Sequence, residues 1–244
     1  MKFYDPNSVL EGRVLYMTGN IGKIGTLGLK DKKEVADAHL TALREVTGSS
    51  GTLVLPAFSW TVARGTPPKF DYIRTQCETG LLPEYARTPS NWQRSSHPLA
   101  SLLCSGLHAE AISRAPSRHA YGPLSPWDVL VSEQAIFISV GMPIRRTISL
   151  VHHVEHLMAV PYRYTKSFIV EMSNDGVELG TQEFFLKVLD QSVSHTRDRN
   201  RSIMNALGGK VESTSEFRDQ VIIESLEMNP FVRHCSLLMA KNPY

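Results

Sequence analysis

The start of the chain predicts a strand, a helix and a second strand in succession. Residues 13–17 (Arg-Val-Leu-Tyr-Met) predict a short strand, and apolar residues recur on one face of a helix expected over about 33–47. Residues 52–55 (Thr-Leu-Val-Leu) are continuously apolar, which is typical of a strand in a parallel sheet. Parallel strands need such a crossover helix, so this segment predicts a βαβ unit and an α/β core.

The rest of the chain continues to alternate strands and helices without a repeat or a clear linker. Residues 64–96 are rich in Pro, Gly and Thr, and a segment this irregular is typical of a functional loop. The Asn-Asp-Gly turn at 174–176 predicts a β-hairpin of 168–172 and 177–179. We therefore expect residues 1–244 to form one domain. Further strands are expected at 102–104 and 135–140, and further helices at 80–87, 107–113, 147–158 (its start capped by Thr147 or Ser149), 196–207 and 215–228.

Composition narrows the class of protein. The 244 residues are 42% hydrophobic, and none of the apolar stretches approaches the roughly 20 residues that span a membrane. Cys77, Cys104 and Cys235 form no CxxC pair, which argues against a disulfide framework or a thiolate zinc site and suits a reducing cytosol. The net charge is +2 with scattered basic residues, so we expect a cytoplasmic protein that binds neither nucleic acid nor membranes. An anionic cofactor would be attracted by this charge.

Three histidines and a glutamate lie together just after the apolar run at 135–140. On a helix, His152 shares one face with Glu155 at i,i+3 and with His156 at i,i+4, while His153 points about 100° away. Ligands gather at the carboxyl ends of sheet strands, so a purely structural role for the whole cluster is disfavoured.

Three chemical interpretations of this cluster remain open. Residues 152–156 spell H-x-x-E-H, a pattern in which two histidines hold zinc and the glutamate activates water; Glu224 or Glu227, on a later helix, could be the third ligand. Alternatively, His152 is a general base whose second nitrogen is oriented by a carboxylate, since an imidazole titrates near neutral pH. A Ser149–His152 nucleophile relay is weakly supported because no G-x-S-x-G motif surrounds Ser149.

A second group of polar residues precedes the strand expected at 102–104. Pro98 fixes a turn there, which places Ser95, His97 and Ser101 at the entrance of the strand. Taken alone, the segment is most simply a structural turn. Residues 119–127 are a further turn-rich segment that is compatible with binding contacts or with a sharp reversal.

These segments, in this order, resemble the aminoglycoside 3-N-acetyltransferase family. Each motif alone is weak, whereas their colinear order is specific, and it covers about the first two thirds of the chain well. The matching residues are Ile24-Gly25, 51–54, 56–60, Phe70-Asp71, 80–84 with Arg87, 94–101, Gly106, His119, Gly122, Ser125-Pro126, Leu130, Gly141, 149–155 and 160–163.

The resemblance implies a mixed α/β sheet with helices packed on both faces and an acetyl-CoA-dependent N-acetyltransferase. His152 matches the general base of the family, Glu155 its carboxylate partner, and Ser149 a hydroxyl that supports the acetyl carbonyl. Acetyl-CoA is then a co-substrate, and we expect no metal. Residues expected to bind coenzyme A are Thr18, Gly19, Asn20, Ile21, Arg94, Ser95 and Ser101, and those expected to contact the acceptor are Phe58, Trp60, His97 and His119.

One departure from the family pattern concerns the coenzyme. Members usually carry a His-Ser-Ser-Leu-like segment after the first strand, and Thr18–Ile21 stands in its place, so the serine hydroxyls are missing. The expected acceptor is the amine of an amino sugar or an aminoglycoside-like molecule, including a nucleotide-linked sugar, because the chain shows no acidic excess (24 Asp+Glu against 26 Lys+Arg). A zinc peptidase and a non-catalytic, coenzyme-binding member are the alternatives. A homo-oligomer is compatible with the sequence.

Overall fold

The computed structural model describes residues 10–26, 28–88, 91–193, 205, 207–208, 212–217 and 221–241, of which 212–217 and 221–222 are described for the backbone alone. Most of the predicted helix at 196–207 therefore lies outside the described residues. Within the described part of the chain, no helix is both long and apolar enough to cross a membrane.

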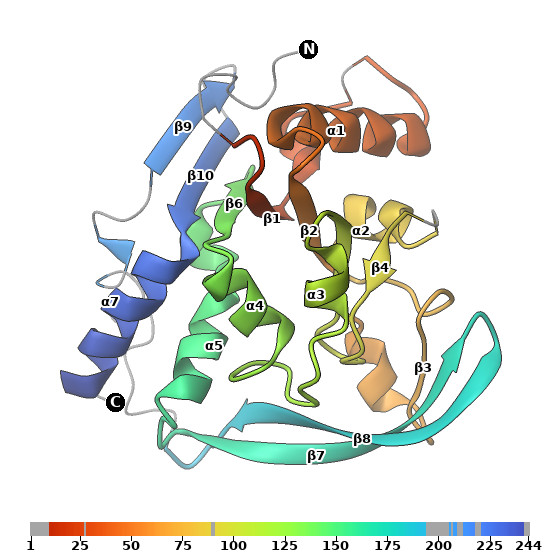
Figure 1. Cartoon of the computed structure of the whole chain (residues 1–244), viewed down its shortest axis with the longest axis vertical. Helices are drawn as coiled ribbons and strands as arrows, with labels where there is room; N and C mark the ends of the chain where they lie inside the picture. Colours follow the sequence, from red (N-terminus) through yellow and green to blue (C-terminus); the bar gives the residue numbers. More distant parts are fainter. Residues whose placement is uncertain are drawn as a thin grey trace.

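A seven-stranded mixed sheet forms the centre of the molecule (Figure 1). Its order is β4-β5-β2-β1-β6-β10-β9, in which β1 pairs in parallel with both β2 and β6, and the other pairings are antiparallel. The parallel pair β1–β2 with its crossover helix confirms the predicted βαβ unit. The strands are β1 (Val14–Gly19), β2 (Thr52–Pro56), β4 (Gln93–Arg94), β5 (Leu102–Gly106), β6 (Ile136–Val140), β9 (Glu212–Phe217) and β10 (Val221–Glu227).

Helices cover both faces of this sheet, as the family resemblance implies. Alternate residues of β1 point to opposite sides: Val14 and Tyr16 join one core, and Leu15 and Met17 join the other. The first core packs under α3, α4, α5 and α7, and the second under α1 and α2. The helices are α1 (Lys32–Thr47), α2 (Leu81–Ala86), α3 (Ala109–Ser113), α4 (Pro126–Ser132), α5 (Leu150–Leu157) and α7 (Met228–Lys241).

A second, three-stranded sheet runs along one end of the molecule in the order β3-β7-β8. The predicted hairpin is confirmed, and its strands are much longer than the sequence pattern indicates: β7 is Arg163–Asn174 and β8 is Val177–Leu189, with the short β3 (Lys69–Asp71) beside β7. The buried Asp71 carboxylate holds the turn, because it accepts hydrogen bonds from the amides of Asp175 and Gly176 and from the Ser173 hydroxyl.

Two sequence predictions about helices are wrong. The helix expected at 215–228 is absent: the end of β9, a gap in the described residues and β10 occupy that range, and α7 begins at Met228. Val221, Ile222 and Ile223 are β-branched residues in succession, which favours a strand. Glu224 and Glu227 consequently lie on β10 rather than on a helix. The turn-rich segment at 119–127 also leads into a helix, α4, that the sequence did not predict.

Candidate active site

Helix α5 carries the candidate catalytic residues and begins shortly after β6. The connection passes through Gly141 and a single 3-10 turn at Ile144–Arg146. This places the helix beside the carboxyl ends of the parallel strands, where ligands gather in α/β sheets. Ser149, one of the two predicted capping residues, occupies the N-cap position, but its side chain makes no capping bond. The Thr147 hydroxyl bonds to Ser139 and to the Ile144 carbonyl instead.

A buried carboxylate lies behind His152. Its Nδ1 is 2.8 Å from Glu155 Oε2, as the i,i+3 spacing predicts. Glu155 is 1% exposed, and a buried carboxylate is costly unless it is paired. Arg163 at the start of β7 supplies the pairing, with its Nε 2.7 Å from Glu155 Oε2, and the Tyr162 hydroxyl donates to Glu155 Oε1 at 3.2 Å.

These contacts define which nitrogen of His152 is open. In the tautomer with its proton on Nδ1, His152 donates to the Glu155 carboxylate oxygen, which lies 2.8 Å away. Arg163 Nη2 lies 3.1 Å from the same nitrogen, so it adds positive charge beside the pair. The side chain of His152 is 37% exposed, and its Nε2 makes no hydrogen bond to the described part of the chain. The remaining lone pair therefore faces a space that a substrate can enter.

Tyr121 borders the His152 ring, and Ser149 links Tyr121 to a second tyrosine, Tyr16. The Tyr121 ring lies edge-on to the His152 ring at 5.4 Å between centroids. The Ser149 hydroxyl hydrogen-bonds the hydroxyls of both Tyr16 and Tyr121, and burial raises the pKa of each tyrosine above its ordinary value. Both tyrosines therefore stay protonated, so this group offers neutral hydroxyl donors one helical turn before His152.

His153 and His156 contact residues of the segment around Gly122 and serve the packing. His153 is fully buried, its Nδ1 accepts a hydrogen bond from the Gly122 amide at 3.2 Å, and burial lowers its pKa to about 4. His156 packs edge-on against His119 with 5.0 Å between ring centroids, next to Gly122. Among the described residues, no group of three or more His, Cys, Asp or Glu side chains is arranged to hold a metal ion. Glu155 is bound to Arg163 instead, so the geometry does not favour the H-x-x-E-H zinc interpretation.

The segment predicted to bind coenzyme A lies at the same edge of the sheet. Thr18 and Gly19 end β1, and the Asn20 amide donates to the Val140 carbonyl at the end of β6 at 2.7 Å. The Asn20 side chain accepts from the Gly22 amide, and Asn20 and Ile21 are exposed or half-buried. Gly19 has φ +118° and an added Cβ would lie 2.1 Å from the Val140 carbonyl, so only glycine fits there.

Arg94, Ser95 and Ser101 lie near this edge, but their polar atoms are used within the protein. Arg94 is buried, with its Nε donating to the Ser101 hydroxyl at 3.0 Å and its Nη2 to the Ala57 carbonyl at 2.9 Å. The Ser95 hydroxyl accepts from the Leu102 amide. These contacts join β4 and β5 to the loop after β2, and coenzyme binding by the three residues remains a prediction.

The residues predicted to contact the acceptor fall into two groups. Phe58 and Trp60 follow the carboxyl end of β2 and pack edge-to-face at 5.7 Å; Phe58 is buried and Trp60 is 49% exposed. His97 is buried between the loop that joins β4 to β5 and strand β8. Its Nδ1 accepts a hydrogen bond from the Ala100 amide, and its Nε2 is 3.2 Å from the Phe185 carbonyl. Burial lowers the pKa of His97 to about 4. His119 stacks on the Phe185 ring at 4.8 Å.

Sequence reasoning overlooked three residues of this site. Arg163 and Tyr162 appeared only as part of the family motif at 160–163, although they bind Glu155. Tyr121 lies in the turn-rich segment whose role was left open. Tyr121 reaches His152 from the loop before α4, and Tyr162 and Arg163 return to Glu155 after the chain turns at the end of α5, so regular helical spacing could not indicate any of the three.

The chain is similar to known proteins in sequence and fold. The family model described as aminoglycoside 3-N-acetyltransferase matches residues 26–220. The solved structure of AAC-IIIb with coenzyme A is 22% identical with a TM-score of 0.76, and the alignment covers 96% of this chain and 92% of that one. Aminoglycoside acetyltransferase AAC(3)-Xa is 22% identical with a TM-score of 0.77 (96% and 88% covered), and AAC-VIa bound to sisomicin is 17% identical with a TM-score of 0.76 (97% and 94% covered).

A search of curated proteins gave no match. The family model nevertheless covers most of the chain, and the solved structures share its fold over nearly the whole length. The chain belongs to the aminoglycoside 3-N-acetyltransferase family and is an acyltransferase.

Proposed function

We propose that this protein transfers an acetyl group from acetyl-CoA to the amine of an amino sugar or an aminoglycoside-like acceptor, with His152 as general base. One observation carries the proposal: His152 Nδ1 is held at 2.8 Å by the buried Glu155 carboxylate, while Nε2 makes no bond to the described chain. This is the arrangement of a base that is oriented by an acid and open to its substrate.

The reaction begins with an acceptor amine that has lost its extra proton. His152 Nε2 takes a proton from this amine as its nitrogen attacks the thioester carbonyl, which forms the new C–N bond. The tetrahedral intermediate then collapses, the C–S bond breaks, and the coenzyme leaves as a thiolate that recovers the proton from the imidazolium. Glu155 stabilises the imidazolium formed in the first step, since its negative charge lies next to Nδ1.

Arg163 sets the strength of this carboxylate. Glu155 must stay ionised while buried, and the guanidinium at 2.7 Å stabilises its charge. The same guanidinium lies 3.1 Å from His152 Nδ1, so Arg163 contacts both the carboxylate and the imidazole.

The Ser149 group supports the oxyanion step. A negative charge develops on the acetyl oxygen during attack, and hydroxyl donors near that oxygen stabilise the transition state. The Tyr121 ring lies beside the His152 ring, and the Tyr121 hydroxyl is hydrogen-bonded to Ser149, which is one helical turn before His152. We assign Ser149 to this role, with Tyr121 positioning its hydroxyl.

Two observations support an amino-sugar acceptor, namely the ligands of related structures and the exposed aromatic side chain of Trp60. Related structures are described as bound to sisomicin or in complex with a gentamicin, and aminoglycosides of this kind carry several amines on sugar rings. Sugar rings present apolar faces, and Trp60 offers an exposed indole beside the carboxyl edge of the sheet. We therefore propose that Phe58 and Trp60 pack against a sugar ring of the acceptor.

The experiment is release of free coenzyme A thiol from acetyl-CoA in the presence of sisomicin, glucosamine or a nucleotide-linked amino sugar. Reactions without acceptor measure hydrolysis. We expect acceptor-dependent release with at least one amine, and mass spectrometry should find one added acetyl group on its nitrogen. Release that never exceeds the acceptor-free rate, in protein that binds coenzyme A by calorimetry, would contradict the proposal and favour a binding-only protein.

A further inference from the structure

Strand β1 places a tyrosine next to the catalytic helix. Tyr16 lies in the middle of β1, on the face of the sheet that α5 covers, and it is 1% exposed. Its ring centroid is 5.0 Å from that of Trp127 and 4.9 Å from that of Phe137. The Tyr121 ring packs on the same tryptophan at 5.5 Å. Trp127, which is fully buried in α4, therefore holds the two tyrosine rings close to each other.

The hydroxyl groups of these two tyrosines share one partner. Each is hydrogen-bonded to the Ser149 hydroxyl, and neither has another hydrogen-bond partner among the described residues. Ser149 is the N-cap residue of α5, yet its side chain makes no capping bond. Its oxygen is therefore available to the two tyrosines rather than to the backbone of the helix.

The number of protons decides how the three hydroxyls are arranged. A tyrosine hydroxyl has one proton to donate, and a serine hydroxyl has one proton and two lone pairs. Burial raises the pKa of both tyrosines, so both of their protons are present at neutral pH. A buried hydroxyl proton is costly to leave without an acceptor, and Ser149 is the acceptor that Tyr16 and Tyr121 share. The Ser149 oxygen then accepts two hydrogen bonds, and its own proton points away from both tyrosines.

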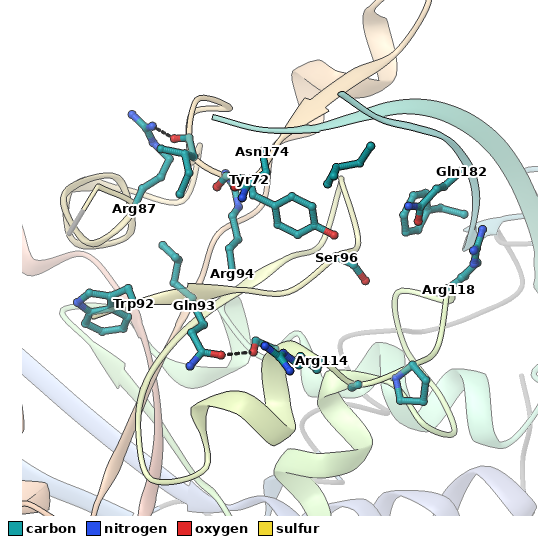
Figure 2. A pocket seen from close by; sticks show the side chains of 17 residues that line it. Tyr72, Arg87, Trp92, Gln93, Arg94, Ser96, Arg114, Arg118, Asn174 and Gln182 are labelled. Atoms are coloured by element: carbon teal, nitrogen blue, oxygen red, sulfur yellow. Dashed lines mark hydrogen bonds between the residues drawn. The ribbon is translucent and has the colours of Figure 1, made fainter. Parts of the chain in front are cut away.

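This group of hydroxyls is separate from the cavity shown in Figure 2. That cavity has a volume of about 590 Å³ and lies between β4, the end of α3 and the β7–β8 hairpin. Tyr16, Tyr121, Ser149 and His152 are not among its described lining residues. A ligand in that cavity would not explain the shared serine. His152, by contrast, is one helical turn from Ser149, and its ring lies 5.4 Å from the Tyr121 ring.

We propose that Tyr16 is a positioning residue, which together with Tyr121 turns the Ser149 proton toward the oxygen of the acetyl thioester. The inference rests on the proposed acetyl transfer with Ser149 as the oxyanion donor, and it adds the residue that fixes the direction of that donor. A hydroxyl that accepts two hydrogen bonds is also a stronger donor, because hydrogen bonds in a chain polarise one another. Tyr16 acts through Ser149 alone.

The kinetic test removes one hydroxyl at a time and measures both thiol release with an acceptor and acceptor-free hydrolysis of acetyl-CoA. Both reactions form an oxyanion, so hydrolysis stays measurable whichever amine is the acceptor. We expect Ser149→Ala to lower kcat about 100-fold and Tyr16→Phe about tenfold. The KM for acetyl-CoA should not change, because the donor acts in the transition state. Tyr16→Phe in the Ser149→Ala background should cause no further loss of kcat.

Two further variants serve as controls. Tyr85→Phe also removes one hydrogen-bonded hydroxyl, which donates to Asp37 at 3.3 Å, but it lies on α2 in the other core and should leave kcat unchanged. Ser149→Thr keeps a hydroxyl at the shared position, so it should retain kcat within about threefold.

Thermal melting tests the hydrogen bonds without any reaction. Ser149→Ala leaves two buried tyrosine hydroxyls without an acceptor, so Tm should fall by about 4 °C or more. Adding Tyr16→Phe removes one of these unpaired hydroxyls and should raise Tm again. The same substitution in the unaltered chain should not raise Tm, because there it removes a satisfied hydrogen bond.

The possible results separate this inference from the proposed function. The inference is overturned if Tyr16→Phe keeps kcat within about twofold while Ser149→Ala loses it, or if the two substitutions are additive in both kcat and Tm. Either result would leave acetyl transfer intact, because that reaction is judged by acceptor-dependent thiol release in the unaltered chain. If the unaltered chain releases no thiol with or without an acceptor, the proposed function and this inference are contradicted together.

Discussion

Replacing Glu155 by glutamine tests the central ion pair while keeping the shape of the side chain. The carboxylate is 1% exposed and contacts His152 Nδ1 at 2.8 Å, Arg163 Nε at 2.7 Å and the Tyr162 hydroxyl at 3.2 Å. Glutamine keeps one oxygen acceptor but loses the charge. The change therefore leaves the Arg163 guanidinium buried without its counter-charge.

Two separate losses follow from Glu155→Gln. Breaking a buried ion pair on one side costs about 3 kcal/mol of unfolding free energy, which lowers Tm by about 6 to 12 °C in a chain of this size. Without the carboxylate, neither the Nδ1–H tautomer nor the imidazolium of His152 is stabilised, so kcat should fall at least about 100-fold. Calorimetric melting and the thiol-release assay measure the two losses independently.

A second substitution separates stability from catalysis. In Glu155→Gln with Arg163→Met, the unpaired cation is gone and an apolar side chain fills its place, so at least half of the lost Tm should return. The catalytic loss should remain, because His152 still lacks its carboxylate. Glu84→Gln is the control, since the Glu84–Arg87 pair is more exposed and should cost only about 1 kcal/mol. A Glu155→Gln enzyme that keeps kcat within about threefold would refute the assigned role of the carboxylate.

Three further predictions concern stability. His153→Ala should lower Tm but leave the activity per folded molecule nearly unchanged, because His153 is fully buried and takes no part in the catalytic contacts. Thermal melting measures the first quantity and active-site titration the second. A loss of kcat at unchanged Tm would contradict this prediction. Burial lowers the pKa of His97 and His153 to about 4, so below pH 6.5 the unfolded chain binds more protons than the folded chain. The unfolding free energy should therefore fall by about 1 to 2 kcal/mol per histidine from pH 7 to pH 5. Denaturant titrations at several pH values that show no such decrease would refute this prediction. Asp71→Asn should cost about 2 kcal/mol, since the carboxylate accepts several backbone amides at the hairpin turn; an unchanged denaturation midpoint would count against it.

Sequence patterns over a few residues correctly predicted the helices and strands that are determined by contacts between residues close together in the chain. The continuous apolar run at 52–55 and the period of the helix at 33–47 gave the βαβ unit, and the Asn-Asp-Gly turn gave the hairpin. The β9–β10 hairpin could not be recognised, because a short apolar run such as Val221–Ile223 fits a buried helix as well as a strand. Its pairing with β6 decides the matter, and that contact is distant in sequence.

The same distinction holds for the candidate site. His152 and Glu155 were predicted to share a face because they are three residues apart on one helix. Arg163 reaches Glu155 only because the chain turns sharply after α5, where Ala159 has φ +45°, and then enters β7. Tyr121 reaches His152 from the loop before α4. Such contacts depend on the packing of separate elements, which spacing along the chain does not encode.

The most direct test of His152 as general base compares His152→Ala with the unaltered chain for thiol release from acetyl-CoA, using the best acceptor of the panel. The account predicts that kcat falls at least about 100-fold while coenzyme A affinity and Tm stay unchanged, because the side chain is partly exposed and only its proton transfer is lost. Increasing the pH should partly restore the rate, as more of the acceptor amine is then unprotonated. Full activity of His152→Ala at neutral pH would contradict the assignment.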